Sequence, residues 1–361
     1  MKLEEFDIIV PLVGTLGNSI VIFDQNLPVT ANQNLAQIKP DKAKVDPIYL
    51  GIFLCSKYGK QQFERAATGN VQPWLNLQQI QSLKVCVATP TQQQSIRTLA
   101  LQSLDEYKKS FALYSKAEEV LLQEVGISEA DFGDELSYLV DFSEADERVD
   151  AEYFQPKYQK LVEKVRASGS KKLGDLVSIK KGFEPGSEAY QDEGKLFIRV
   201  SSLSKFGVQS LDQKYLSEEL YENLKADYQP RPGEILLSKD ATPGTAYVLS
   251  EPIDGIISGG ILRLKLKVEI DPEYLALVIN SLVGQMQAER DAGGSVIKHW
   301  KPDQIKSLEI PILPKTTQEN IGDLVRQSHA ARRESKELLE QAKREVEDII
   351  ELQSRRGSAK V

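Results

Sequence analysis

The chain has 361 residues, 41% of them hydrophobic, and a net charge of −8. This length and apolar content predict two compact domains with connectors and exclude a chain that is disordered throughout, and no apolar run approaches the roughly 20 residues of a membrane-spanning helix. The two cysteines form no CxxC pair and the two histidines lie 30 positions apart, so we expect buried thiols in a reducing cytoplasm, no metal site and no cofactor.

The acidic residues are unevenly distributed along the chain. Residues 124–152 contain eleven Asp or Glu and one basic residue, Arg148, whereas residues 171–315 contain 19 Lys or Arg and 21 Asp or Glu. The net charge argues mildly against a nucleic-acid binder. Because the acidity is concentrated in one connector, basic clusters within residues 171–315 remain free to contact phosphate.

The first part of the chain is one copy of an internal repeat. Residues 46–96 and 271–321, compared without a gap, are identical at 19 of 51 positions. Upstream, with an offset of 227 residues, Gly17 matches Gly244. Self-similarity of this kind predicts two units with the same local fold.

The first copy, residues 1–91, is shorter than the second. The counterpart of residues 171–233 would lie before Met1, so we expect the first domain to lack its front half. The alternatives are a fragment, an internal start or one half of a split gene, because a genuine half-domain would expose sheet edges that proteins avoid.

A long polar-apolar segment follows each copy, at residues 92–127 and 316–356. Apolar positions recur in steps of three, four and seven residues, and the second seam is interrupted by Ser328, Arg332 and Ser335. Both segments are too polar to be buried on all sides. The heptad spacing therefore predicts two long helices that pair as an antiparallel coiled coil, with Arg332 as a residue that sets register or contacts a partner.

An acidic connector and a helix, together residues 128–170, lead into the second globular domain, residues 171–315. Short β-branched runs predict strands at residues 197–203, 234–240, 246–250, 261–267 and 308–313. Asp271 followed by Pro272 predicts the start of one amphipathic helix that continues to Glu289. The predicted fold class is α+β, with a twisted, mostly antiparallel sheet and helices in each repeated domain.

No catalytic motif is present in the sequence. There is no GxxxxGK[ST] loop, no strand–GxGxxG–helix pattern and no Asn-Pro-Pro-Tyr element. The stretch DEGK, residues 192–195, has the end of a nuclease motif without its upstream Asp. The two distant histidines also offer no nucleophile–base pair, so we expect a protein that is not an enzyme.

Three stretches carry a resemblance to a known family: GGSVIKHWKPDQIKSLEIPILPKTTQENI (293–321), KKLGDLVSIKKGFEPGSEAY (171–190) and DERVDAEYFQPKY (146–158). With the alternation of globular unit and long helix, the chain resembles the DNA specificity subunit of type I restriction-modification systems. The resemblance implies two target recognition domains, each of which reads half of a bipartite double-stranded DNA site. It also implies a coiled-coil spacer that docks methyltransferase subunits, and an endonuclease/translocase subunit that carries the cleavage chemistry.

Candidate DNA-contacting residues lie mainly where polar loops follow predicted strands of the second domain. Arg suits guanine, Ser is permissive, and most Lys contacts position the DNA rather than read it. Some of these residues have a named structural alternative. The loop that contains Lys180, Lys181, Ser187 and Tyr190 could be an ordinary polar loop, and Arg199 could form a structural ion pair. For Trp300, next to Lys298 and His299, packing is the favoured role. The candidates are Lys180, Lys181, Ser187, Tyr190, Arg199, Ser201, Ser202, Lys239, Asp240, Thr242, Lys298 and His299, with Gln72 and Asn76 in the first domain.

Two other functions remain open at this point. The chain could be a coiled-coil scaffold whose globular units bind protein, or a self-contained nuclease. DNA affinity that falls steeply with salt separates the first from a specificity subunit, and metal-dependent cleavage by the chain alone would support the second.

Overall fold

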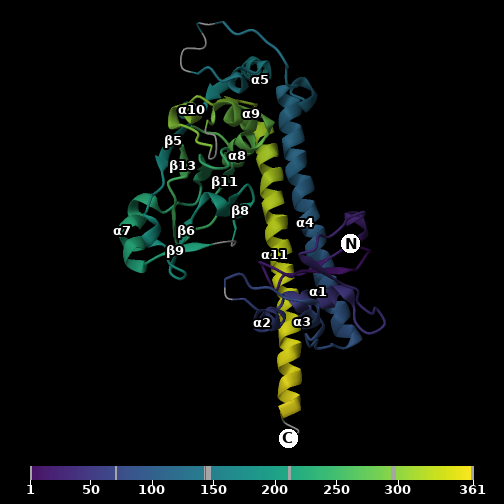
Figure 1. The fold of residues 1–361 in the computed structure, drawn as a ribbon. Coiled ribbons are helices and arrows are strands. Elements are labelled where there is room, and N and C mark those ends of the chain that lie inside the picture. The colour runs from purple at the N-terminus through teal and green to yellow at the C-terminus, as the bar shows by residue number, and fades with distance from the viewer. Residues whose placement is uncertain are drawn as a thin grey trace. The chain divides into compact units, whose positions relative to one another are not determined.

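The computed structural model describes residues 2–69, 71–141, 143, 148–209, 213–293 and 298–358. The chain divides into two compact units (Figure 1): unit 1 is Met1–Lys109 with Ala330–Val361, and unit 2 is Ser110–His329. The long helices α4 (Pro90–Val125) and α11 (Lys315–Ser358) each contribute residues to both units. Helices and mostly antiparallel strands are mixed in each unit, as the predicted α+β class requires.

Unit 1 contains a three-stranded antiparallel sheet in the order β2–β1–β3, with Ile8 paired to both Val21 and Ile38. Tyr49 is fully buried beside this sheet, and Val346 of α11 belongs to the same core. The elements are β1 (Ile8–Pro11), β2 (Ile20–Val21), η1 (Asp24–Asn26), β3 (Leu35–Ile38), α1 (Pro47–Cys55), α2 (Lys57–Ala66) and α3 (Leu77–Gln81).

Unit 2 contains a four-stranded sheet in the order β11–β10–β13–β5, a three-stranded sheet β12–β6–β9, and the pairs β14–β4 and β7–β8. Between named strands of the described chain, only β12 and β6 pair in parallel. The strands are β4 (Ser170–Lys172), β5 (Val177–Lys181), β6 (Lys195–Ile198), β7 (Leu203–Ser204), β8 (Gly207–Val208), β9 (Lys214–Leu216), β10 (Ile235–Ser238), β11 (Ala246–Val248), β12 (Gly255–Ile257), β13 (Ile261–Leu266) and β14 (Glu309–Pro311).

The helices of unit 2 enclose one large core, to which Leu161, Leu237, Leu277 and Trp300 belong. The packing role considered for Trp300 is confirmed, because only 1% of the residue is exposed. The helices are η2 (Glu129–Asp131), η4 (Ala151–Phe154), α5 (Pro156–Ala167), α6 (Leu173–Leu176), η5 (Ser187–Ala189), η6 (Val200–Ser202), α7 (Glu218–Tyr228), α8 (Pro272–Asn280), α9 (Leu282–Asp291) and α10 (Pro302–Lys306).

Two predicted elements differ from the structure. The single helix expected after Asp271 is broken at Ser281, whose backbone is extended (ψ 174°) and whose hydroxyl accepts a hydrogen bond from Val283 N, so that it ends α8 and caps α9. The strand expected over residues 197–203 ends at Ile198. Beyond it the Ser202 hydroxyl accepts from Arg199 N and donates to Arg199 O, which closes a 3₁₀ turn instead.

The two copies of the repeat form the same hydrogen bonds, each within its own unit. Asp46 caps α1 and Asp271 caps α8, each through two backbone N–H groups. The hydroxyl of Tyr49 donates to Cys86 O, and that of Tyr274 donates to Pro311 O. The identities between the copies thus correspond to the same helix caps and buried hydrogen bonds.

The turns that follow the equivalent strands β1 and β10 have the same backbone conformation at a matched glycine. Gly17 (φ 80°) and Gly244 (φ 91°) are both left-handed, a conformation that glycine adopts without steric cost. The match made between these two residues from the sequence therefore corresponds to a shared backbone turn.

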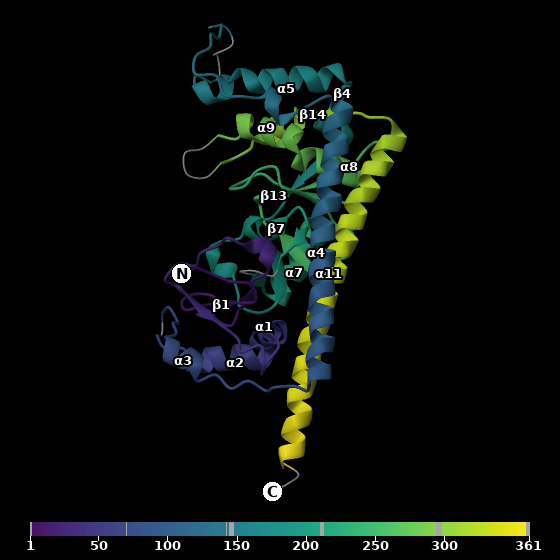
Figure 2. The ribbon, with the colours of Figure 1, turned by 90° about the vertical axis from the view of Figure 1, so that its right-hand side faces the viewer.

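α4 and α11 are paired inside each unit (Figure 2). In unit 1, Ser95 Oγ lies 3.2 Å from Glu345 Oε2, and the Ser103 and Ser335 hydroxyls each donate to the other's carbonyl at 2.7 Å. As the residue numbers on α4 increase, those of their partners on α11 decrease, so the two helices are antiparallel here. The seam thus contains small, buried polar residues at which backbones approach closely.

In unit 2 the same two helices are joined by a serine contact. The Ser328 hydroxyl donates to Ser110 O at 2.6 Å, and Ser328 is completely buried. All three polar residues that interrupt the predicted seam therefore contact the facing helix, because Arg332 places its guanidinium 4.5 Å from the ring centroid of Tyr107, an α4 residue of unit 1.

Among the described residues, none of the helices has both the length and the apolar character that crossing a membrane requires.

Candidate nucleic-acid interface

Three loops of unit 2 meet at the glycine turn between β12 and β13. A Cβ atom on Gly259 would lie 2.2 Å from Glu184 Cγ, and one on Gly260 would lie 2.8 Å from Val200 Cγ2 and 3.4 Å from Asp240 Oδ2. Only glycine permits this approach. The turn thereby brings together the loops that follow β5, β6 and β10.

Asp240 holds two neighbouring side chains in this region. Its Oδ2 lies 2.5 Å from Lys239 Nζ and its Oδ1 lies 2.8 Å from His299 Nδ1. Burial raises the pKa of Asp240, but hydrogen bonds from Lys239 and His299 outweigh it and bring the pKa below its usual value. The carboxylate is therefore ionised at neutral pH and orients the His299 ring, whose side chain is 63% exposed.

The backbone around this carboxylate is tightly turned. Ala241 has a φ of 60° and donates its N–H to Lys298 O at 3.0 Å. Thr242 and Lys298 are exposed, and Thr242 O accepts from the Ser238 hydroxyl at 2.5 Å. The left-handed residue and the interloop hydrogen bond keep both exposed side chains beside Asp240.

The turn after β6 contributes one buried and two accessible residues. Ser202 is 3% exposed and its hydroxyl is used inside the turn. Ser201 is exposed and Arg199 is half-buried. Only Ser201 and Arg199 of this predicted trio have side chains that reach solvent.

The loop after β5 supplies two exposed lysines. Lys180 and Lys181 lie at the end of β5, where Lys180 pairs with Arg263 in the sheet, and Lys181 Nζ lies 2.8 Å from Glu184 Oε1. Tyr190 instead packs against Phe197, with ring centroids 5.6 Å apart. Ser187 lies in η5, and its side chain is outside the described part of the structure.

Eight of the predicted residues thus lie close to this turn, and we call them the loop cluster. Lys181 ends β5, Lys298 and His299 lie on the loop before α10 that is hydrogen-bonded to Ala241, and the others follow β6 and β10: Arg199, Ser201, Lys239, Asp240 and Thr242. Lys180 adjoins the cluster within β5. The cluster combines cationic groups, hydroxyls and one fixed carboxylate. These are the groups that contact phosphates and base edges. Within the described chain, no three His, Cys, Asp or Glu side chains gather in a way that could hold a metal ion.

The two predicted residues of unit 1 lie in the corresponding loop of the first copy. Asn76 caps α3 by accepting from Gln79 N at 2.9 Å, so its amide has a structural role, whereas Gln72 is exposed. Val13 and Trp74 form the β-bridge that Asp240 and His299 form in unit 2. Trp74, 46% exposed, was missed from the sequence, although it occupies the position of a predicted residue in the repeat.

Residues 168–344 match the family described as the type I restriction modification DNA specificity domain. The whole loop cluster lies inside this range. Residues 168–344 belong to the type I restriction-modification DNA specificity family.

Solved structures include two similar specificity subunits. The type I restriction-modification S subunit from M. genitalium is 14% identical, with 97% of this chain and 81% of that chain covered and a TM-score of 0.37. The HsdS subunit from Thermoanaerobacter tengcongensis is 14% identical, with 96% of this chain and 81% of that chain covered and a TM-score of 0.33. A search of curated proteins found no match.

The specificity domain also contains the glycine turn that sequence reasoning missed. Gly259 and Gly260 stand between the two apolar runs of β12 and β13. A glycine pair at such a place signals a close backbone approach, and this signal identifies the point at which the loops meet.

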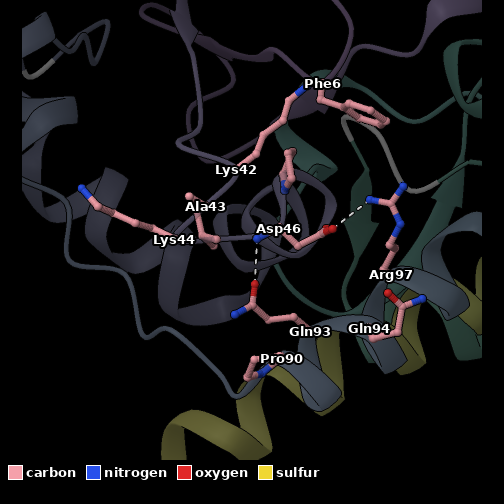
Figure 3. Close-up of a pocket in the computed structure, with 11 residues that line it drawn as sticks. Phe6, Lys42, Ala43, Lys44, Asp46, Pro90, Gln93, Gln94 and Arg97 are labelled. Atoms are coloured by element: carbon pink, nitrogen blue, oxygen red, sulfur yellow. Dashed lines mark hydrogen bonds and ion pairs between the residues drawn. The ribbon is translucent and has the colours of Figure 1, made fainter.

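Unit 1 has a pocket of about 360 Å³, which lies outside the residues that match the specificity domain (Figure 3). Asp46 lies at its centre, 2.8 Å from Arg97 Nη1, and its N–H donates to Gln93 Oε1 at 2.7 Å. Lys42 lies over the Phe6 ring. Asp46 and its two partners are thus engaged in joining α1 to α4, and we assign them a structural role.

Proposed function

We propose that the chain is a DNA-binding specificity subunit of a type I restriction-modification complex and has no catalytic activity of its own. The observation that carries this proposal is the position of the loop cluster within residues 168–344, the part that matches the DNA specificity domain. The cluster offers hydrogen-bond donors and acceptors suited to DNA. Among the described residues, no three His, Cys, Asp or Glu side chains gather there in a way that could hold a metal ion.

The side chains suggest a division of roles within the cluster. The exposed Lys181, together with Lys180 beside the cluster, positions the phosphate backbone, and Arg199 and Ser201 contact base edges or phosphates. The His299 ring, held by Asp240, adds a donor or acceptor of fixed direction. Lys239 is 13% exposed and ion-paired, so it supports Asp240 more than it contacts DNA.

We further propose that the two units are two target recognition domains, each for half of a bipartite site. The equivalent caps and buried hydrogen bonds of the two copies support this proposal. Residues 1–91 and 171–315 would be the readers. Residues 92–127 and 316–356 would form a coiled-coil spacer, with residues 128–170 as connector.

The chemistry would belong to partner subunits. Methyltransferase subunits would dock on the spacer helices and modify the DNA, and the endonuclease/translocase subunit would cleave it. We propose that this complex assembles in the cytoplasm, a reducing compartment that suits a chain with two unpaired cysteines.

Selection from a random duplex library tests this function. The chain, purified with its methyltransferase partner, should enrich a defined motif, and Arg199→Ala should relax the preference at one position by about 1–3 kcal/mol if Arg199 reads a base. Lys225→Ala, which alters a lysine on α7 that is paired with Glu222 and lies outside both the loop cluster and the spacer helices, is the matched control and should keep the motif. Failure of the wild-type complex to enrich any motif would refute the proposal.

A further inference from the structure

One face of unit 1 is open where the equivalent face of unit 2 is covered. An open groove of about 580 Å³ is lined by Phe53, Tyr58, Gln62, Arg65 and Val85, among others. Val85 is 36% exposed and the nearby Val87 is 51% exposed. Exposed valines two residues apart have the spacing of one side of a strand, so this segment offers an apolar edge to which a strand can be added.

The repeat shows what covers this face in unit 2. Val85 corresponds to Ile310, and Ile310 is completely buried. Strand β14 there pairs with β4, with Ile310 opposite Lys171, and Ile312 N donates to Gly169 O. The edge of unit 2 is therefore closed by the strand that follows α5.

The helix α5 covers the rest of the same face. Its apolar residues Tyr158, Leu161 and Val165 are all buried in the core that contains Val283 and Ile310. Val283 is the counterpart of Tyr58 in the groove. Their spacing of three and four residues places them on one side of the helix.

The end of α11 does not take the place of α5 in unit 1. Ile350 of α11 lines the groove, and its counterpart in the repeat, at the same offset of 225 residues, is Val125 near the end of α4. Val125 is buried in unit 2 together with α5. Each copy thus has the neighbouring long helix, but only unit 2 has a helix–turn–strand cover among the described residues.

The charge at the edge differs between the copies and defines the occupant. Glu309 Oε1 accepts from Arg166 of α5 at 2.8 Å. The corresponding residue of unit 1 is Lys84, which is exposed and forms no ion pair with any described residue. A covering segment with an arginine at the position of Arg166 would be repelled by Lys84, whereas one with an acidic residue at that position would be attracted.

We propose that this groove and the adjoining edge, residues 84–87, bind a helix–turn–strand segment of another polypeptide. The segment follows the pattern of residues 156–172, with an apolar side on the helix and a turn before the strand. It carries an acidic residue where this chain has Arg166. Binding of this segment at the groove does not depend on DNA recognition, so either property can be present without the other.

Two labelled peptides of residues 153–176, one native and one with Arg166→Glu, test the proposal against the full-length chain by fluorescence anisotropy. The Arg166→Glu peptide should bind about five to ten times more tightly than the native peptide. Lys84→Glu in the chain should reverse this order, because the charge at the edge is reversed. Val85→Glu should abolish the binding of both peptides.

The matched control is Val268→Glu, which alters an apolar residue of unit 2 that is 40% exposed and should leave binding unchanged. Hydrogen exchange gives a second readout: saturating peptide should protect the Val87 amide, as Gly169 O protects that of Ile312. No saturable binding of either peptide, or binding unaffected by Val85→Glu and Lys84→Glu, would overturn the proposal. A dimer of the free chain that dissociates on Val85→Glu would overturn it in favour of a second copy as occupant.

Discussion

Individual side chains of the loop cluster differ in how firmly they are held. Asp240 is fixed by Lys239 and by His299, whereas Lys180 and Lys181 project from the end of a strand and are exposed. Exposed lysines without rigid geometry suit phosphate contacts, which add affinity but little sequence information. This difference predicts distinct effects for the two groups.

Replacement of both strand-end lysines, Lys180→Ala with Lys181→Ala, should weaken DNA binding about tenfold or more at low salt and lower the salt slope by about 2. The loss should be the same for all duplexes, because phosphate contacts do not read sequence. Anisotropy titrations at several salt concentrations measure both quantities. An altered motif with an unchanged salt slope would assign the two lysines to base contacts instead.

Glu309 provides a pH-dependent test of the unit 2 fold. Burial raises the pKa of Glu309, but hydrogen bonds from Ser170 and Arg166 outweigh it and the pKa lies below its ordinary value. A carboxyl group with a lowered folded pKa stabilises the fold at neutral pH, and this contribution is lost as pH falls through the lowered pKa. Glu309→Gln should therefore reduce the free energy of unfolding by about 1–2 kcal/mol at pH 7.

Urea unfolding of the two proteins, followed from neutral to acidic pH, checks this expectation. The difference should shrink below the ordinary carboxyl value of 4.5, where unfolded Glu is protonated. Glu269→Gln, which alters an ion pair whose side chains are 67% and 83% exposed, should change little. A difference that is independent of pH would contradict an ionic role for Glu309.

At the scale of elements, the same aspartate cap begins α1 and α8, and the cap of α8 makes the larger number of contacts. Asp271 accepts hydrogen bonds from Glu273 N and Tyr274 N, and its carboxylate also pairs with Arg326 on α11 at 3.0 Å. Gly322 stands opposite the carboxylate, where a Cβ would lie 2.6 Å away. The cap therefore joins two helices as well as starting one.

Asp271→Ala should destabilise the chain by about 1–2 kcal/mol, since it removes the cap and leaves Arg326 without this partner. Asp271→Asn keeps an acceptor for the backbone N–H groups and should cost less. Denaturant unfolding of the three proteins gives the order directly. If the Asn variant were as unstable as the Ala variant, the ion pair rather than the cap would dominate.

Many of the strands and helix boundaries could be predicted from the sequence. The repeat and β-branched runs indicated β10, β11, β13 and β14, and the Asp-Pro pair indicated the start of α8. Apolar periodicity alone did not reveal the break at Ser281, because the buried apolar residues continue across it, with Ile279 before the break and Val283 after it. The short turn at Val200–Ser202 was missed because it depends on a local side-chain hydrogen bond rather than on residue type.

The candidate site was harder to predict, because it depends on contacts between loops distant in sequence. Lys239, Asp240 and His299 were selected individually, but nothing in their spacing showed that Asp240 holds both of the others. The buried role of Ser202 and the packing of Tyr190 likewise depend on tertiary neighbours. Residue type thus indicated candidates, and the glycine turn determined which of them meet.

On the scale of the whole molecule, the two units share a scaffold and differ in their loops. Asp240 and His299 of unit 2 correspond to Val13 and Trp74 of unit 1. Unit 2 thus carries a fixed carboxylate and imidazole, and unit 1 carries an aliphatic side chain and an exposed indole at the equivalent positions. If both units contact DNA, as proposed, they should prefer different half-sites, because the side chains at equivalent positions offer different hydrogen bonds.

The central claim, that this chain recognises DNA, is tested most directly by its affinity for duplex DNA across a salt series, measured on the complex with its methyltransferase partner. We predict an affinity that falls steeply as salt rises, with a preference for certain duplexes that persists at each salt concentration. A complex that binds no duplex preferentially at any salt concentration would contradict the account.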